Sequence, residues 1–462
     1  MRFLSLGLVV TLLIIGFPYA KKSYGAAENI NKKEFSVFDS HNDTMMKIID
    51  EKTWLPIIDI RESTNLQIDI EKMKKGKFDV GYFAAYSSPF YGNPDRSVSR
   101  TLAIINGLYY TQKRNQDVFN IAKSSEEINK TLAGGRIAAV PAIEGAYSIS
   151  NENAEELLNQ YYDLGVRSIG FTWNYSNALG QGLHKAFGDK NGTKSPAGLT
   201  DLGIKTIERM NKLGIIVDVS HLSVESFFDV IKYTKAPIIA SHSGAYRVNS
   251  HIRNLYDNQI LAIGENGGVI GVVYHDEFVK TKESASVSYI VDHIDYIVNL
   301  IGIDHVGMGS DFDGANLPKD LKDASKLGLI TDELIGRGYT EEEIKKICFK
   351  NHLRVLEEVE ALSEKEKVVD NQNIYPYFIM GESFDSKRPV FKARLTQGEK
   401  DSSYRFIING IPYDIKENHG LLEFQVKKDL KEKFYVVSFE KRDKDGRISR
   451  VTRIIYIENK TQ

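Results

Sequence analysis

The chain has 462 residues, of which 42% are hydrophobic and 26% are charged, a composition typical of globular proteins. The 60 Lys and Arg residues against 62 Asp and Glu residues give a formal net charge of −2, which argues against nucleic acid or another polyanion as a partner. Because single cores stop growing near about 250–300 residues, we expect one large domain and a smaller one.

Residues 1–25 have the order of regions found in a secretory signal peptide. Arg2 precedes an apolar run from Phe3 to Ala20, and small and polar residues follow. We therefore expect export to the periplasm or the extracellular space, with no stable membrane insertion after cleavage. An uncleaved membrane anchor is the alternative, because the run approaches the roughly 18 residues that a span needs. Cys348 is the single cysteine, so no intramolecular disulfide is expected.

Eight apolar segments predict strands, and segments with helical spacing separate them. This alternation is typical of parallel βαβ units and predicts an α/β fold, a (β/α)₈ TIM barrel over residues 26–362. An open doubly wound sheet is the alternative, but no glycine-rich phosphate loop follows the first strand. The predicted strands are, in order, FSVFDSHND, KFDVGYFAAYS, RIAAVPAIEG, VRSIGFTWN, GIIVDVSH, PIIASH, GGVIGVVY and HVGMGSDFDG.

The composition changes after the barrel segment. A polar, charged linker covers residues 363–373, and short alternating segments with turn pairs such as Asn409-Gly410 and Asp445-Gly446 follow it. Strands separated by such turns predict a small all-β, sandwich-like accessory domain over residues 374–462. No metal-binding or nucleophile pattern occurs in it, so we expect it to serve packing or partner binding.

Polar residues gather where the predicted barrel strands end, which is where barrel enzymes carry their chemistry. These residues are His41, Asp43, Glu144, His221, His242 and Asp311. Imidazole and carboxylate groups suit two divalent ions such as zinc. His41 and Asp43 would hold one ion, His221 and His242 the other, and Glu144 would bridge them. Such a pair polarises a carbonyl and makes hydroxide from a bridging water, and Asp311 would pass the proton on.

These motifs resemble those of the membrane (renal) dipeptidase family, whose members are amidohydrolase-type zinc peptidases. The resemblance is to the bacterial branch of this family. The similar stretches extend from about residue 36 to about residue 360. They are DSHNDT, AIEGAYSI, LGVRSIGFTWN, GIIVDVSHLS, APIIASHSGAYRV with HIRN, and GSDFDG. The resemblance implies an exported dipeptidase with two zinc ions and the ligand roles given above. It also implies that Asp311 is the catalytic acid and base, that Arg253 pairs with the substrate carboxylate, and that a homodimer is possible.

One position departs from the family pattern. Where mammalian members carry a substrate-contacting histidine, this chain reads Thr172-Trp173-Asn174, so Trp173 would shape the pocket and Asn174 or Asn177 would donate to the substrate. His184 lies in a glycine-rich loop that would cover the site. An alternative function is hydrolysis of another cyclic amide, a β-lactam or a lactone, since amidohydrolase barrels act on many substrates. A catalytically silent binding protein is the third hypothesis, although no ligand is missing.

Overall fold

The structure is a computed structural model that describes residues 34–183, 197–281, 284–364, 373–396 and 402–458. The predicted signal peptide and the His184 loop lie outside these residues. Within the described ranges, no helix is both long and apolar enough to cross a bilayer.

Eight parallel strands close into a barrel, which confirms the predicted fold. Around the ring the neighbouring strands are, in order, β2, β1, β9, β8, β7, β6, β5 and β4, and pairing between β2 and β4 closes it. The barrel strands are β1 (Val37–Asn42), β2 (Phe78–Tyr86), β4 (Ile137–Glu144), β5 (Ser168–Gly170), β6 (Ile216–Asp218), β7 (Ile239–Ser243), β8 (Val269–Val272) and β9 (Val306–Met308).

A ninth strand, β3 (Phe119–Ile121), was not expected from the sequence. It pairs in parallel with the first residues of β4, from Ile137 to Ala139, while β5 pairs with the last residues of the same strand. The segment is too short for an alternating pattern to stand out. It extends the sheet beside β4 without entering the closed ring.

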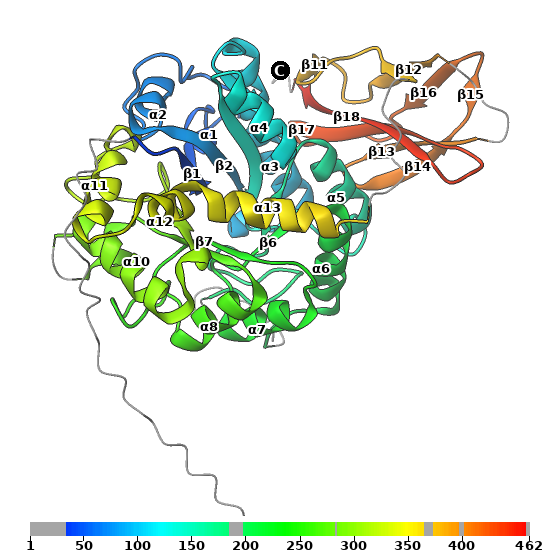
Figure 1. Cartoon of the computed structure of the whole chain (residues 1–462). Helices are drawn as coiled ribbons and strands as arrows, with labels where there is room; N and C mark the ends of the chain where they lie inside the picture. Colours follow the sequence, from blue (N-terminus) through cyan, green and yellow to red (C-terminus); the bar gives the residue numbers. More distant parts are fainter. Residues whose placement is uncertain (1–33, 184–196, 282–283, 365–372, 397–401, 459–462) are drawn as a thin grey trace, which may run out of the picture.

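Helices surround the barrel, as Figure 1 shows. They are α1 (Thr44–Lys47), α2 (Ile70–Gly76), α3 (Pro94–Arg114), α4 (Ser125–Ala133), α5 (Ala154–Asp163), α6 (Asp201–Leu213), α7 (Val224–Tyr233), α8 (Asp257–Asn266), α9 (Asp276–Val279), α10 (Val287–Ile301), α11 (Gly328–Gly336), α12 (Glu341–Lys345) and α13 (Asn351–Leu362). Short turns of helix occur at Pro89–Tyr91, Ile303–His305, Ala324–Lys326 and, in π form, Lys346–Lys350. Four of the sequence segments with helical spacing, residues 153–165, 201–214, 223–234 and 287–302, form α5, α6, α7 and α10.

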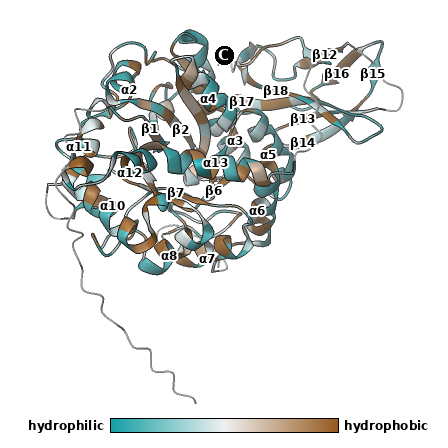
Figure 2. Ribbon diagram, in the orientation of Figure 1, coloured by the Kyte–Doolittle hydropathy of each residue, from teal (hydrophilic) through white to brown (hydrophobic). Residues whose placement is uncertain are grey.

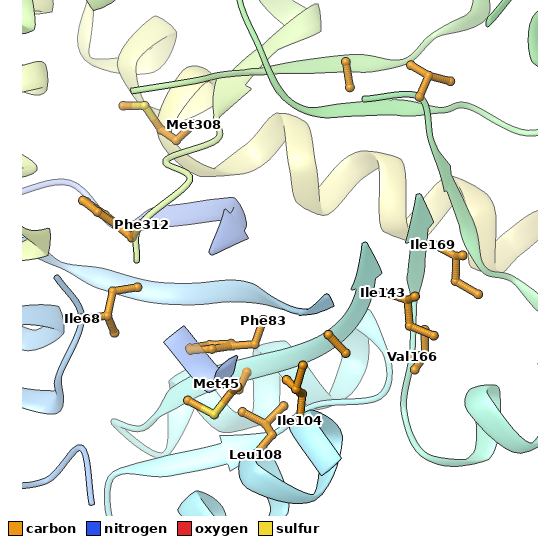
Figure 3. Packing of buried hydrophobic residues seen from close by; sticks show 14 of the residues in the cluster. Met45, Ile68, Phe83, Ile104, Leu108, Ile143, Val166, Ile169, Met308 and Phe312 are labelled. Atoms are coloured by element: carbon orange, nitrogen blue, oxygen red, sulfur yellow. The ribbon is translucent and has the colours of Figure 1, made fainter. Parts of the chain in front are cut away.

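The core lies in two layers. One layer packs the outer side of the strands against the helices; in Figure 3, Phe83 of β2 lies beside Met45 of α1 and Leu108 of α3. In Figure 2, α7 and α10 carry both hydrophobic and hydrophilic residues, as helices do when one face covers a sheet. The second layer fills the barrel and includes Phe38 of β1. Val355 of α13 belongs to the same layer, so this helix covers one end of the barrel.

The C-terminal residues form two packed β-sheets, confirming the all-β prediction. One sheet has the order β10-β12-β16-β15 and the other β11-β18-β17-β13-β14. Their strands are β10 (Ile374–Pro376), β11 (Glu382–Phe384), β12 (Val390–Leu395), β13 (Ser403–Ile408), β14 (Ile411–Ile415), β15 (Glu417–Asn418), β16 (Leu421–Gln425), β17 (Phe434–Arg442) and β18 (Ile448–Ile457). We call this unit the sandwich.

The sandwich packs closely against α3 and α5, which lie beside it in Figure 1. Strand β17 is buried on both faces: Phe434 and Val436 belong to the barrel core, whereas Val437 and Phe439 belong to the sandwich core. Because successive side chains of a strand point to opposite faces, β17 joins the two cores.

Candidate metal centre

The five predicted metal ligands come together at the carboxyl ends of the barrel strands. His41 lies near the end of β1 and Asp43 directly after it, Glu144 ends β4, and His242 lies in β7. His221 follows β6 by three residues and has a φ of 68°, an uncommon conformation for a residue other than glycine. All five side chains are buried.

Glu144 faces histidines on two sides. Its Oε2 lies 3.8 Å from His41 Nε2, and its Oε1 lies 3.0 Å from His221 Nε2 and 3.7 Å from His242 Nε2. His41 Nε2 is also 3.8 Å from Asp43 Oδ2. Two groups of potential ligands result, His41 with Asp43 and Glu144, and His221 with His242 and Glu144. The carboxylate shared by both groups is positioned to bridge two ions.

The polar atoms of this cluster fit a metal better than they fit one another. His41 Nε2 and Asp43 Oδ1 are buried and accept or donate no hydrogen bond among the described residues. Buried polar atoms without a partner are uncommon, and metal ligation satisfies both types of atom. Gly314 lies so close that a Cβ there would collide with the carboxylates of Asp43 and Asp311. The donor atoms, their burial and this close packing all suit divalent cations.

The electrostatics of the cluster also indicate a site suited to divalent cations. Burial and the negative charge of Asp43 raise the pKa of Glu144 well above its usual value. Burial opposes protonation of His41, but the carboxylates of Glu144, Asp43 and Asp311 outweigh it and raise the pKa of His41 to about 10. Crowded carboxylates of this kind are stabilised by cations.

Both histidines of the second group are held by a partner on Nδ1. The Nδ1 atom of His221 lies 2.8 Å from Asn174 Oδ1, and that of His242 lies 2.8 Å from Ser241 Oγ. Ser241 in turn donates to Asp218 Oδ2 at 2.5 Å. Such partners fix the ring and would direct Nε2 toward a bound metal. Asn174, which we expected to donate to the substrate, thus uses its oxygen to hold a candidate ligand.

Asp218 and Ser241 were not identified from the sequence. Asp218 ends β6, inside a run read as an apolar strand, and Ser241 precedes His242 in β7. The signal available was a polar residue shortly before each histidine, Asp218 in DVSH and Ser241 in ASH. Asn177 instead holds its own loop, because its Nδ2 donates to Phe171 O at 2.6 Å.

Asp311 lies beside the same cluster. Its backbone N–H donates to His41 O at 3.0 Å, and its carboxylate groups with His41 and His242. Burial and the charge of Asp43 raise the pKa of Asp311 to about 7, against the opposing effect of His41. A carboxyl group with a pKa near neutrality is suited to general acid and base catalysis.

Arg253 and Trp173 lie beside His221 and His242, the histidines of the second ligand group. Arg253 is buried, and its Nη2 donates to His242 O at 3.0 Å and lies 3.2 Å from His221 Nε2. Its Nε has no hydrogen-bond partner among the described residues. The Trp173 ring lies 6.0 Å from the His221 ring and 5.8 Å from Tyr86, so it forms an aromatic wall beside the cluster.

A barrel with these ligand groups at its catalytic end is the architecture of a metal-dependent hydrolase, and comparison with known proteins defines the class. The family model for the membrane dipeptidases, peptidase family M19, matches residues 26–369. The chain is 31% identical over 386 residues to the dipeptidase verJ of Clonostachys rogersoniana, covering 78% of this chain and 95% of that protein.

Solved structures agree. A metallopeptidase from Rhodobacter sphaeroides, solved with a phosphinate mimic of the dipeptide L-Ala-D-Ala, is 28% identical, has a TM-score of 0.62, and aligns over 71% of this chain and all of that one. A dipeptidase of family M19 is also 28% identical, with a TM-score of 0.63 over 71% of this chain and 99% of that one. The chain is therefore a metal-dependent peptide hydrolase. It belongs to the membrane dipeptidase family.

Proposed function

We propose that this protein is an exported zinc-dependent dipeptidase that hydrolyses the single peptide bond of dipeptides. The observation that carries the proposal is the division of Glu144 between two ligand groups, with Oε2 toward His41 and Oε1 toward His221 and His242. Membership of the dipeptidase family supports the reaction type.

Zinc suits the donor set because it accepts imidazole nitrogen and carboxylate oxygen together. His41, Asp43 and Glu144 would hold one ion, and Glu144, His221 and His242 the other. Bound ions would polarise the scissile carbonyl and lower the pKa of water. Asn174 and Ser241 would keep the two histidine rings in orientation by occupying their Nδ1 atoms.

Asp311 would move the proton of the reaction. Its carboxylate would accept a proton from the attacking water and deliver it to the nitrogen of the leaving amine. A pKa raised to about 7 allows the group to exist in both protonation states near neutrality.

Arg253 would bind the free carboxylate of the substrate through its guanidinium group, which matches carboxylate geometry with two donors. The Nε atom is free for this purpose, and the ring of Phe278, 5.5 Å from Arg253 Cζ, lies against the guanidinium group. Because Arg253 also contacts His221 and His242, a carboxylate bound there would lie about one residue from the metal pair, which restricts the substrate to dipeptides. Trp173 would form the wall against which the substrate packs.

We propose that residues 1–25 direct export and are removed, and that 26–362, 363–373 and 374–462 are the catalytic domain, the linker and the accessory domain. A homodimer is proposed from the family resemblance alone.

The test is hydrolysis of a panel of L-L and L-D dipeptides, with a chelator and with zinc added back. We expect chelator-sensitive cleavage of dipeptides and far slower cleavage of tripeptides and amidated dipeptides. Equal turnover of a lactone or cyclic amide that lacks a carboxylate would contradict the assignment of Arg253. Turnover that survives complete removal of metal would contradict the mechanism.

A further inference from the structure

Three cationic side chains surround one buried tryptophan away from the metal centre. Arg96 Cζ lies 5.2 Å, Arg100 Cζ 5.4 Å and Lys433 Nζ 5.1 Å from the centroid of the Trp54 ring. Arg96 also lies 5.4 Å from the ring of Tyr91. The residues come from three parts of the fold: the segment after α1, the first turns of α3, and the sandwich immediately before β17.

These cations form no direct ion pair among the described residues. Carboxylates lie near them without contacting them: Asp50 and Glu432 near Lys433, and Glu51 near Arg100. The nearby Asp50 accepts hydrogen bonds from the Lys52 and Thr53 backbone N–H groups within its own turn. Arg337, by contrast, contacts three carboxylates.

Placing these charges together is unfavourable without a counter-charge. Arg96 and Arg100 are four residues apart on α3, a spacing at which like charges face each other and repel. Burial and the charge of Arg96 lower the pKa of Lys433. Attraction to the faces of Trp54 and Tyr91 offsets part of this repulsion, but an aromatic ring carries no net charge.

The backbone at Trp54 is unusual as well. Trp54 has a φ of 63°, a left-handed conformation that bulky residues rarely adopt. The turn is held by hydrogen bonds from Trp54 N to Asp50 O at 2.8 Å and from Asp50 N to Leu55 O at 2.9 Å. Conformations of this kind persist where the surrounding structure enforces them, and they concentrate at functional sites. Here the conformation places the indole among the three cations.

We propose that Arg96, Arg100 and Lys433, arranged around Trp54, form a binding site for a phosphate-bearing anion at the junction of barrel and sandwich. Arg96 is exposed and Arg100 and Lys433 are partly buried, so solvent reaches the site. Guanidinium groups bind phosphate oxygens in pairs, and lysine adds a point charge. A phosphate group has several oxygens to face three elements and carries about −1.5 to −2 charges near pH 7, whereas a carboxylate has two oxygens and one charge.

The site is independent of the proposed peptidase activity, because none of its residues belongs to the metal centre. A ligand there would connect α3 of the barrel to the start of β17. It would therefore hold the two units together, as well as neutralise the cations.

Trp54 itself reports the binding. The chain has two tryptophans, so a Trp173→Phe protein leaves Trp54 as the sole indole. Titrating this full-length protein with sodium pyrophosphate at fixed ionic strength should give a saturable change in fluorescence. Arg100→Gln and Lys433→Gln should each weaken the apparent affinity about tenfold or more. Arg394→Gln and Lys428→Gln, which alter exposed cations of the sandwich, are the matched controls and should not change it.

A second experiment, with lipid vesicles, distinguishes a lipid headgroup from a soluble phosphate as the source of the anion. Vesicles of equal phosphatidylglycerol and phosphatidylcholine that bind the protein only when Arg100 and Lys433 are present would assign a lipid headgroup. Pyrophosphate binding without vesicle binding would assign a soluble phosphate. The proposal is overturned if pyrophosphate produces no saturable change in Trp54 fluorescence. It is also overturned if Arg100→Gln and Lys433→Gln leave the affinity for pyrophosphate unchanged, or if acetate binds as tightly as pyrophosphate. Arg96→Gln, at an exposed position, gives a third variant should either of the others fail to fold.

Discussion

At the scale of single residues, the centre depends on side chains that hold the ligands in place. His221 projects from a left-handed turn, and its Nδ1 lies 2.8 Å from Asn174 Oδ1. The tautomer with the proton on Nδ1 donates to this oxygen and carries on Nε2 the lone pair that a metal ligand needs. Asn174 thus acts through His221.

Replacing Asn174 by alanine should weaken zinc binding by about ten- to a hundredfold, because the imidazole loses its fixed orientation. Competition with a chromophoric chelator measures the affinity. Asn151→Ala removes an exposed asparagine and should have no effect. An Asn174→Ala protein with unchanged zinc affinity would show that Asn174 does not orient His221.

Arg253→Lys tests the carboxylate clamp while preserving the positive charge. Lysine lacks the planar pair of donors, so KM for dipeptides should rise about tenfold or more, while hydrolysis of the corresponding dipeptide amides should change little. Steady-state kinetics on both substrates, with metal content measured in parallel, show whether the loss is confined to substrates with a free carboxylate. An equal loss on both substrates would place Arg253 in support of the metal ligands instead.

The candidate ligands could be predicted because each terminates an apolar run. His41, Glu144 and His242 are polar residues at the ends of buried strands, and parallel strands bring such ends to one side of a barrel. Asp218 and Ser241 could not be identified in this way. Their role depends on contacts between neighbouring strands, such as the bond from Ser241 to Asp218, and a single strand does not reveal them.

At the scale of elements, a buried histidine connects α10 to the loop after β7 and to the end of α9. His293 Nδ1 accepts the Ala245 N–H at 2.9 Å, and its Nε2 lies 3.1 Å from Val279 O. These bonds need a neutral ring with the proton on Nε2. Burial lowers the pKa of His293 from 6.5 to about 4.

This shift predicts acid lability. Between pH 6.5 and 4 the unfolded chain binds a proton at position 293 that the folded chain does not, so stability is full above pH 6.5 and falls as the pH drops through this window. The loss should be roughly 3 kcal/mol of unfolding free energy from this residue. Urea unfolding at pH 7 and pH 4.5 should show a smaller pH effect in His293→Gln than in the natural chain.

His419→Gln alters an exposed histidine and serves as the control, with an unchanged pH effect. His352, whose pKa burial also lowers to about 4, contributes in the same direction and remains in both proteins. A His293→Gln protein with the full pH dependence would show that His293 is not the group responsible.

The elements themselves were predictable to different degrees. Long helices such as α6, with its Thr200 cap and its Gly214 end at a φ of 81°, carry clear signals in the sequence. The three-residue strand β3 does not, since its place depends on pairing with β4. The segment containing Cys348 has continuous helical spacing, which does not reveal the π-helical turn that the structure places between α12 and α13.

At the scale of the molecule, the barrel and the sandwich share buried contacts. Gln160 of α5 donates to Ser438 Oγ at 2.9 Å and accepts from Gly410 N at 2.8 Å, and Arg450 Nε lies 2.6 Å from Asp163 Oδ2. The sequence predicted a separate β unit and left its attachment open, because an alternating strand does not show what covers its second face.

This shared interface predicts that both units unfold in one cooperative transition. Gln160→Leu would leave Gly410 N without its partner in a buried position and should lower stability by roughly 1–3 kcal/mol. Differential scanning calorimetry should show a single endotherm at a lower temperature. Gln116→Leu, at an exposed position, should leave the temperature unchanged. Two separate endotherms in the natural chain would contradict the shared core.

In the proposed function, Glu144 bridges two metal ions on which peptide hydrolysis depends. The most direct measurement determines metal content by mass spectrometry together with dipeptide turnover, for the natural chain and for Glu144→Gln. We predict two zinc ions per chain and turnover in the natural protein, and loss of at least one ion with a more than thousandfold fall in kcat in Glu144→Gln. A Glu144→Gln protein that retains both ions and full turnover would contradict the account.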